Sequence, residues 1–299
     1  FATNNTVMTS LINANSPLTF DATMLGAATV YAENMQATII SPFLLAGAMS
    51  PVTVAGTATQ ILAEALAGMA YIQLVRPGAP VVFGTFAAAI SMQSGAPTFG
   101  TPEQNLIILV AASLARRLNV PFRTGGGLGA SKMADAQAGY EKALTTLAAV
   151  LAGGNMVATY PGAVGSLMGQ SLEGIVIDND MMGAALRILR GIEVTEERLS
   201  LKEIENVVFG DGHFLNQPQT LELMRTEYLY PEVGDRRPVG DWEESGSPTV
   251  YDLAHDKVRE ILSSHYPEYI QPDVDGKIRE NFPIKIEQGD TKPGNGRWD

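Results

Sequence analysis

The sequence predicts an α/β protein with the fold of a TIM (β/α)8-type barrel. Three observations support this prediction: short apolar segments alternate with long helix-like runs, glycine or proline marks most turns between them, and the runs are long enough to connect parallel strands. Parallel strands need connections of a dozen or more residues, which are usually helical. The length of 299 residues is also usual for a single barrel of this type.

Five strands are expected, and a helix follows each of them. The strands begin near residues 7, 36, 80, 120 and 155, the helices cover residues 20–35, 54–75, 101–118, 131–151 and 171–190, and loops are expected at 46–51 and 87–100. Asp21 lies near the start of the first helix, where a carboxylate suits the helix dipole. Thr101 is a suitable helix cap, Pro102 suits the first helical position, and Gln104 lies where a capping box requires it.

The pattern changes after Gly191. Residues 1–192 are expected to form the barrel units, and residues 193–299 a helical C-terminal extension whose tail packs on the barrel. The extension is expected to contain a helix at 195–209 capped by Ser200, a turn at 210–215, helices at 219–227 and 250–264, an irregular stretch at 228–246 and a wrapping tail after Pro267. A barrel of eight units needs three more strands, so either they precede Phe1 in the natural protein or the chain is a part-barrel.

The composition argues against several classes of function. The net charge is -12 and the sequence pI is near 4.7, so a polyanion would be repelled and nucleic acid is not expected as a partner. The chain has no cysteine, which excludes disulfides and thiolate metal sites. Only three Lys/Arg and four Asp/Glu residues precede Val120. Such an uncharged first part suggests helices that also touch other subunits, so we expect a homo-oligomer.

Neither a membrane span nor a metal site is indicated. No stretch approaches about 20 continuous apolar residues, and no signal peptide is visible. We therefore expect a cytoplasmic protein without a membrane partner. Of the three histidines, His255 and His265 lie in a charged, helix-like segment and are expected to be solvent exposed. A metal site built from several histidines is therefore not indicated.

A glycine-rich turn follows the fourth strand. Gly125, Gly127 and Ala130 fit the spacing G-x-G-x-x-A, which can hold a pyrophosphate on backbone amides. The acidic residue that would hold a ribose about 20 residues later is absent. The pattern therefore favours a tight turn that packs at the mouth of the barrel. Ligands of such folds collect at the carboxyl ends of the strands, so we expect the site at 124–132 and 160–171.

Several polar residues near these turns have both a structural and a functional interpretation. Lys132 and Asp135 suit an ordinary capped, salt-bridged helix start, or the rim of a site. Ser171 most simply caps the following helix, and Tyr160 fits either the core or the site. His213 lies in a turn and is either a loop histidine bonded to backbone or a site group folded over the barrel.

Other charged and polar residues are placed at helical spacing. Gln137 and Glu141 lie on neighbouring turns of the same helix. Glu173, Asp178 and Asp180 lie in the early turns of the next helix, where carboxylates favour the helix dipole.

A set of motifs occurs in a fixed order along the chain. It comprises Ser16-Pro17-Leu18, Gly125-Gly126-Gly127-Leu128-Gly129-Ala130-Ser131-Lys132, Asp135-Ala136-Gln137-Ala138-Gly139-Tyr140-Glu141-Lys142, Gly212-His213-Phe214-Leu215, Gln219-Thr220-Leu221, Arg225-Thr226-Glu227-Tyr228, Asp235-Arg236-Arg237 and Trp242-Glu243-Glu244. In these motifs the chain resembles the trimethylamine methyltransferase (MttB-like) superfamily. The resemblance runs from about Val7 to Leu262.

The resemblance implies both a fold and a reaction. Members of this superfamily are TIM barrels, longer at the amino end, that move a methyl group from a methylated amine to the cobalt of a corrinoid, usually carried on a separate small protein. A corrinoid (cobalamin) is therefore expected as the methyl acceptor, a corrinoid protein as the partner, and no metal bound by the chain itself. A pyrrolysine is associated with substrate activation in the family's trimethylamine enzymes. Every residue here is standard, so the resemblance implies a quaternary amine such as glycine betaine.

The expected chemistry selects the candidate residues. A quaternary ammonium leaves as a neutral amine without needing a proton, and its cation favours aromatic faces and a nearby carboxylate. The expected substrate-binding residues are Phe86, Phe122, Thr124, Gly125, Gln170 and Glu173, and the expected catalytic residues are Tyr160, His213, Lys132 and Asp135. Two alternatives stay open: a trimethylamine or tertiary-amine methyltransferase with a corrinoid or folate acceptor, and a non-catalytic betaine-binding barrel.

Overall fold

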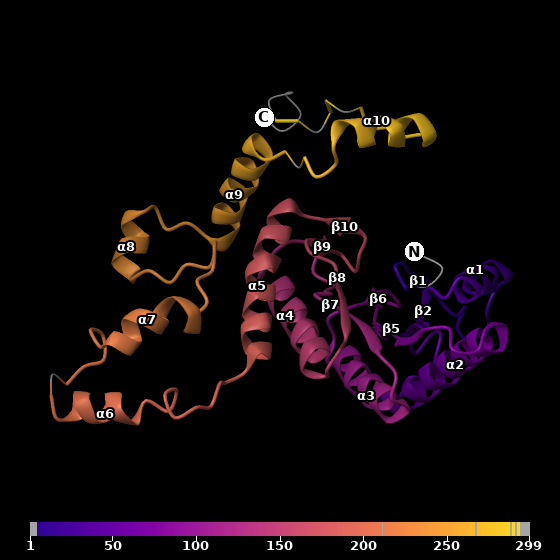
Figure 1. The fold of residues 1–299 in the computed structure, drawn as a ribbon, viewed down its shortest axis with the longest axis horizontal. Helices are drawn as coiled ribbons and strands as arrows, with labels where there is room; N and C mark the ends of the chain where they lie inside the picture. Colours follow the sequence, from indigo (N-terminus) through magenta and orange to yellow (C-terminus); the bar gives the residue numbers. More distant parts are fainter. Residues whose placement is uncertain (1–4, 211, 267, 288, 291, 294–299) are drawn as a thin grey trace.

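A curled parallel sheet forms the centre of the structure, a computed structural model that describes residues 5–210, 212–266, 268–287, 289–290 and 292–293. In hydrogen-bonded order its strands are β1 (Thr9–Ile12), β2 (Ala37–Ile40), β4 (Val81–Gly84), β7 (Phe122–Gly126) and β8 (Met156–Thr159). Each neighbouring pair is parallel, and the spatial order follows the chain order. The five predicted strands are confirmed, and they curl into a half-barrel (Figure 1).

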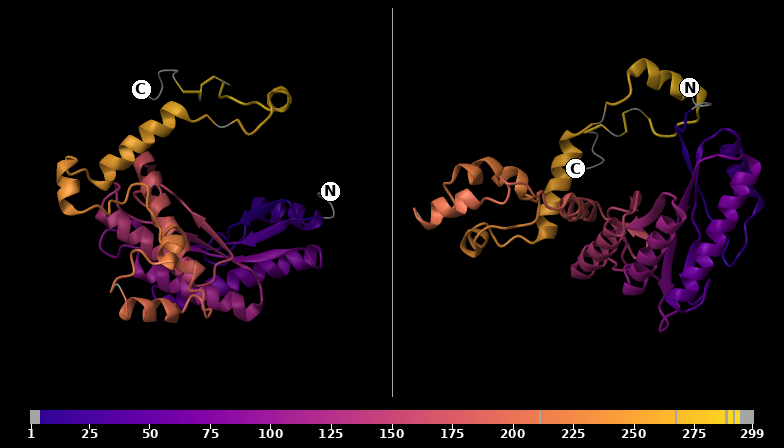
Figure 2. Two further views of the ribbon diagram at one scale, coloured as in Figure 1. Left: turned by 60° about the vertical axis from the view of Figure 1, so that its left-hand side comes forward. Right: turned by 60° about the horizontal axis from the view of Figure 1, so that its bottom comes forward.

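A helix follows each strand, as the sequence predicts. These helices are α1 (Ala22–Glu33), α2 (Val54–Val75), α3 (Pro102–Leu118), α4 (Ala136–Leu151) and α5 (Leu172–Arg190). Helices α1 to α4 pack on the strands, and α5 packs on α4, so the helices line one side of the sheet (Figure 2). The main hydrophobic core lies between the two layers and is built around Ile40, Ile61, Phe83, Ile107 and Phe122.

Three helix starts use caps that the sequence indicates. Asp21 caps α1, and Ser171 Oγ accepts a hydrogen bond from the Gly174 N–H at 3.0 Å at the start of α5. Thr101 caps α3 by accepting from the Gln104 N–H at 3.3 Å. The capping box expected there is not closed on Thr101, however, because the Gln104 side chain accepts from the N–H of the preceding residue, Gly100, at 2.8 Å.

A small second sheet continues two of the barrel strands beyond their carboxyl ends. Strand β3 (Phe43–Ala46) begins just after β2, and β5 (Phe86–Ile90) just after β4; the two pair in parallel, and β6 (Pro97–Thr98) joins antiparallel. The prediction of a loop over 87–100 is therefore wrong for the residues that belong to β5 and β6. The glycines and polar residues of this segment suggest a loop, but Ala87 and Ala88 are buried where β5 pairs with β3.

The C-terminal extension is helical. It contains α6 (Leu201–Val208), α7 (Pro218–Glu227), α8 (Val239–Glu244), α9 (Val250–Ser264) and α10 (Pro272–Asn281). Helix α9 packs along α5, whereas α6, α7 and α10 reach away from the sheet (Figures 1 and 2).

The expectation of an irregular stretch at 228–246 is wrong because this stretch contains α8, and α10 lies in a tail for which the sequence indicates no helix. Asp211 and Pro267 lie outside the described residues, and the division into domains at residue 192 stays a prediction.

Polar contacts join the extension to α5. The carboxylate of Asp180 accepts hydrogen bonds from the three consecutive N–H groups of residues 232–234 at 2.8 to 3.0 Å. Asp180 therefore anchors a segment of the extension as well as lying in the early part of its helix. Ser200 does not cap α6, as the sequence suggested, because its φ is +54° and its hydroxyl donates to the Gln219 side chain at 2.7 Å.

Helix α2 is the most apolar of the barrel helices. With 22 residues, it is the one helix among the described residues that is long and apolar enough to cross a membrane by length and composition. It packs on β2 and β4 and buries Glu64. The Glu64 carboxylate accepts hydrogen bonds from the Ser16 hydroxyl at 2.7 Å and the Leu18 N–H at 2.8 Å. In this structure α2 therefore serves as a core helix of the half-barrel.

We expect Ile61→Ala on α2 to lower the free energy of unfolding by about 2–5 kcal/mol, because the Ile61 side chain is 0% exposed in the main core and its loss leaves a cavity. Leu74→Ala is the matched control on the same helix, since Leu74 is 84% exposed, and should change stability by no more than about 0.5 kcal/mol. Urea unfolding followed by circular dichroism measures both. Equal losses for the two variants would contradict the packing of α2 described above.

A candidate active site at the carboxyl ends of the strands

Strand β7 divides its side chains between the helix layer and the inner face of the sheet. Phe122 packs edge-on against Phe83 in the main core, with ring centroids 6.0 Å apart. Because side chains alternate along a strand, Arg123 and Gly125 lie on the opposite, inner face. A Cβ added to Gly125 would meet Leu128 and Phe86, which belong to a second, smaller cluster. The inner face of β7 is therefore where the expected site begins.

Arg123 is a buried cation on this inner face. It is only 4% exposed, and the β-sheet register places it beside Gly84, the last residue of β4. Its guanidinium carbon lies 5.8 Å from the centroid of the Phe86 ring. Its nitrogens lie 3.5 Å from the Thr85 carbonyl oxygen and 3.5 Å from the Tyr160 hydroxyl. Arg123 is not among the residues predicted for the site, although a lone arginine inside a short apolar strand is a signal that could have identified it.

Three aromatic rings gather around Phe86. The centroid of Phe86 lies 5.6 Å from that of Phe43, 5.5 Å from that of Phe99 and 5.8 Å from that of Tyr160. These residues come from β3, β5, the segment before α3 and the end of β8. We call Phe43, Phe86, Phe99 and Tyr160 the aromatic cluster. It brings together Phe86 and Tyr160, two of the residues predicted for the site, and it borders Arg123.

The glycine turn after β7 is held by α4. Gly127 has a φ of +65°, which favours glycine, and the chain then turns back toward α4. The buried Glu141 carboxylate accepts hydrogen bonds from the N–H groups of Ala130 at 2.7 Å and Ser131 at 3.2 Å, and Thr145 accepts one from Leu128 at 3.0 Å. These amides are already bonded within the protein, so the geometry agrees with a tight turn rather than a pyrophosphate cradle.

Helix α4 begins later than the sequence suggests. Its first residue is Ala136, and residues 131–135 form bends before it. Asp135 caps the helix by accepting from the Ala138 N–H at 2.9 Å, and it also accepts from the Ser131 hydroxyl at 2.7 Å. These bonds, the Ala138 one first, lower the pKa of Asp135 below its ordinary value. Asp135 thus has the capping role that was one of its two interpretations.

Lys132 is exposed beside this helix start. Among the ion pairs of the described residues none joins it to Asp135, so the expected salt bridge is not formed. Lys132 instead lines a cleft of about 490 Å³ together with Phe99, Glu141 and Ser166. Because Phe99 belongs to the aromatic cluster, this cleft adjoins the cluster, and the role of Lys132 at the rim of a site stays a prediction.

The loop after β8 carries Tyr160 and forms a small hairpin of β9 (Ala163–Val164) and β10 (Gly169–Gln170). Tyr160 and Gln170 line a shallow pocket of about 410 Å³ there. The base of the loop is fixed by a buried ion pair: Asp178 accepts from Lys142 Nζ at 2.6 Å and from the Gly162 N–H at 2.7 Å. Asp178 therefore positions the loop, a role that helical spacing alone does not reveal.

Phe122, Thr124 and Glu173 lie apart from the inner face. Phe122 is in the core, and alternation along β7 places Thr124 on the same side. Glu173, in the first turn of α5, accepts from the Ser171 hydroxyl at 2.9 Å and lies 3.0 Å from His255 Nδ1. His255 was expected to be simply solvated, but it bridges α9 to α5. Substrate-binding roles for these residues stay predictions that their placement does not favour.

His213 is exposed in the segment between α6 and α7. That segment lies at the left of Figure 1, away from the carboxyl ends of the strands. His213 is therefore not assembled with the aromatic cluster. This placement matches a loop histidine better than a group folded over the barrel.

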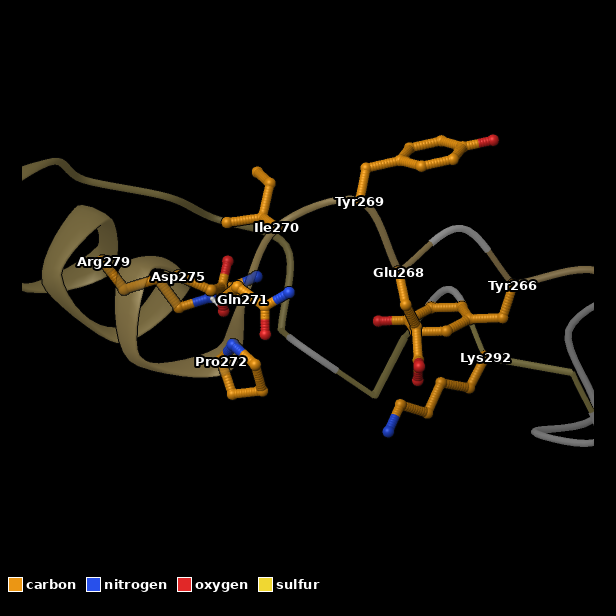
Figure 3. Close-up of a pocket in the computed structure, with 9 residues that line it drawn as sticks. All are labelled: Tyr266, Glu268, Tyr269, Ile270, Gln271, Pro272, Asp275, Arg279 and Lys292. Atoms are coloured by element: carbon orange, nitrogen blue, oxygen red, sulfur yellow. Dashed lines mark hydrogen bonds and ion pairs between the residues drawn. The ribbon is translucent and has the colours of Figure 1, made fainter.

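A further pocket of about 400 Å³ lies within the tail around α10 (Figure 3). Two tyrosines line it, but the ammonium of Lys292 already lies 5.3 Å from the centroid of the Tyr266 ring. Figure 3 shows the Tyr269 ring pointing away from the other lining residues. The residues of this pocket come from the tail, not from the carboxyl ends of the strands, where ligands of parallel βα folds collect, so this pocket is not the candidate site. No group of three or more His, Asp or Glu side chains suited to a metal occurs among the described residues.

The parallel strands in chain order and the helices that follow them define the chain as a partial βα barrel, a fold whose ligands commonly bind at the carboxyl ends of the strands. More specifically, the chain belongs to the family described as trimethylamine methyltransferase (MTTB), which it matches over residues 1–288. The resemblance expected from the motifs is thereby confirmed.

The proteins to which this chain is similar are named for two different substrates. A glycine betaine methyltransferase of Desulfitobacterium hafniense (strain Y51) is 38% identical over 91% of this chain and 57% of its own length. A trimethylamine methyltransferase MttB of Methanosarcina thermophila is 37% identical over 77% of this chain and 47% of its own. A protein of that second name from Desulfitobacterium hafniense (strain DSM 10664 / DCB-2) is 30% identical over 79% of this chain and 47% of its own. The chain thus spans about half the length of these relatives.

We expect the contact between α5 and α9 to weaken in acid. The hydrogen bond from His255, followed by one from its own backbone, lowers the pKa of Glu173 below its ordinary value of 4.5. Because the folded-state pKa is lowered, the stabilisation is present above the ordinary glutamate pKa and is lost as pH falls through the folded-state pKa. The variant His255→Ala should raise the pKa of Glu173 toward 4.5, as measured by an NMR titration of its carboxyl carbon.

The matched control is His265→Ala, which removes an exposed histidine from the end of the same helix. It should leave the pKa of Glu173 unchanged. A Glu173 pKa that is equal in the wild type and in His255→Ala would contradict the described contact.

Proposed function

We propose that the protein carrying this chain moves a methyl group from a quaternary methylammonium compound, glycine betaine or a close analogue, to the cobalt of a corrinoid. The observation that carries this proposal is the aromatic cluster at the carboxyl ends of the strands. A quaternary ammonium cannot donate a hydrogen bond, so aromatic faces are among the few protein groups that attract it. Each such face contributes on the order of 0.5–2 kcal/mol, and more where water is excluded.

The leaving group supports a quaternary substrate. When a cobalt(I) nucleophile takes a methyl group from glycine betaine, the C–N bond breaks and its electron pair stays on nitrogen, so the product leaves as dimethylglycinate, an amine that is neutral at nitrogen and keeps its carboxylate. No proton transfer is needed, so the site needs no strong acid at the leaving nitrogen. Asp135 is committed to capping α4 and Glu173 to the contact with α9, so neither is placed to supply one. In this proposal the residues of the chain bind the substrate, orient it and shield it from water.

The corrinoid is a second substrate in this proposal, and a separate protein brings it to the site. Its cobalt must approach the methyl carbon opposite the C–N bond, which requires an open route to the carboxyl ends of the strands. The cleft that contains Lys132 and Phe99 and the pocket beside Tyr160 both adjoin the aromatic cluster. Lys132 at the rim of this cleft is an exposed cation that can contact a partner or its cofactor. The relative named for glycine betaine supports this substrate class.

Trimethylamine is the second candidate substrate, because other relatives are named for it. Trimethylamine is tertiary, so its nitrogen must be activated before it can leave. A proton NMR assay with reduced cobalamin and a panel of glycine betaine, proline betaine, carnitine and trimethylamine separates the candidates. Loss of a methyl from a betaine supports the proposal, and loss only from trimethylamine supports the alternative. Methylated folate appearing without corrinoid would contradict the corrinoid acceptor, and binding without turnover would indicate a non-catalytic barrel.

We expect Phe86→Leu to raise KM for glycine betaine by about 10-fold, which corresponds to about 1.4 kcal/mol and lies within the range of one cation–π contact. Phe86 is the ring that touches the other three aromatic rings, so its loss removes the centre of the cluster. Initial rates at varied substrate concentration measure the change, and circular dichroism reports whether the variant is folded.

Phe209→Leu makes the same substitution at a ring that is 85% exposed just after α6. It should leave KM unchanged, because Phe209 lies in the extension. A folded Phe86→Leu protein with the wild-type KM would show that the aromatic cluster does not bind the cation.

A further inference from the structure

We propose that Arg123 binds the carboxylate of a zwitterionic substrate and so makes the site prefer betaines to simple methylammonium cations. The proposal rests on the proposed function, because it names a second recognition element in the same site. It assigns the specificity for the acidic end of the substrate to one side chain. The aromatic cluster then recognises the other end.

The first observation is that Arg123 is a buried cation without a buried anion. Its hydrogen-bond partners are a carbonyl oxygen and a hydroxyl, both 3.5 Å away, at the outer limit for a hydrogen bond. No ion pair among the described residues involves it. Burying a charge is costly unless the charge is paired and well hydrogen bonded. The position of Arg123 is therefore that of a group whose partner arrives from outside.

Lys142 shows what a satisfied buried cation looks like in this chain. Its ammonium lies 2.6 Å from the Asp178 carboxylate, and the two side chains are 3% and 6% exposed. Lys142 therefore has a structural role, fixing α4 to α5. Arg123 is as well buried but has no such contact, so a purely structural role does not explain why this strand position carries a charge.

The guanidinium also suits the proposed ligand. Its five N–H donors form a rigid planar fork that matches a carboxylate, and its two hydrogen bonds of 3.5 Å are weak enough to leave this donor set available. In glycine betaine a single methylene separates the ammonium from the carboxylate, so the two recognition groups must be neighbours. The guanidinium carbon lies 5.8 Å from the Phe86 centroid, and Tyr160 borders both groups.

The positive charge of Arg123 also disfavours the binding of a simple methylammonium cation. A simple cation such as tetramethylammonium would be attracted by the aromatic rings but repelled by the guanidinium beside them. A betaine carries its own anion, which neutralises the guanidinium when it binds. Discrimination therefore comes from attraction of one ligand and repulsion of the other, which is how selective sites are commonly built.

The test is a calorimetric binding experiment on the purified full chain with glycine betaine and tetramethylammonium, without corrinoid. The substitution Arg123→Gln should weaken glycine betaine binding by about 10- to 100-fold, as expected for loss of a hydrogen bond between charged groups. Tetramethylammonium binding should stay the same or become tighter. Arg123→Lys keeps the charge but not the fork, so it should keep the repulsion of tetramethylammonium and only part of the betaine affinity.

Arg117→Gln is the matched control, because Arg117 is exposed on α3 and should affect neither ligand. Equal weakening of both ligands in a folded Arg123→Gln protein would overturn the proposal, since a structural role predicts that result. Unchanged affinities for both ligands would also overturn it, because Arg123 would then contact neither of them.

A wild-type measurement covers the case in which Arg123→Gln does not fold. The anion 3,3-dimethylbutyrate has the shape of glycine betaine and its carboxylate, but lacks the positive charge. It should displace glycine betaine more effectively than tetramethylammonium does, and the opposite order would overturn the proposal. If these binding results hold and no methyl is transferred to cobalamin, the proposed function fails while the role of Arg123 stands.

Discussion

The candidate site depends on the parallel hydrogen bonding of five strands in chain order. Parallel pairing places every carboxyl end at one edge, so residues far apart in sequence become neighbours. Arg123 reaches Thr85 across 38 residues in one direction and Tyr160 across 37 in the other. The small second sheet adds Phe43 and Phe86 directly above this edge. None of these contacts is local, so the site exists only where the sheet is formed.

Two adjacent residues on α4 then fix the loops that border the site. Glu141 bonds the amides that follow the glycine turn after β7, and Lys142 pairs with Asp178, which also holds Gly162 after β8. Removing one partner of a buried charged pair leaves an unpaired charge, which is more costly than the pair is favourable. The buried charges of α4 are therefore better understood as positioning devices than as sources of stability. Glu141 holds the glycine turn on α4, and the Lys142–Asp178 pair holds the loop that follows Tyr160.

The sequence predicted elements well and side-chain partners poorly. Strand and helix periodicity located all five barrel units, and the motif order identified the family. Asp178 and Asp180 were assigned to the helix dipole, because only the fold shows that one holds Lys142 and the other the amides of residues 232–234. Phe86 and Tyr160 were anticipated from strand ends. Phe122 is on the opposite face because alternation along β7 depends on its exact register, which apolar composition does not reveal.

The charges of the protein favour a zwitterion over either of its parts. A net charge of -12 lowers the concentration of free anions near the surface, although at physiological salt this effect reaches only about 8 Å. The guanidinium of Arg123 opposes a bare cation inside the site, where screening is weak. A betaine has no net charge to be repelled outside, and it offers opposite charges to the aromatic cluster and to Arg123 inside. A net negative charge on the chain and a buried arginine in the site thus both favour substrates that carry both charges on one small molecule.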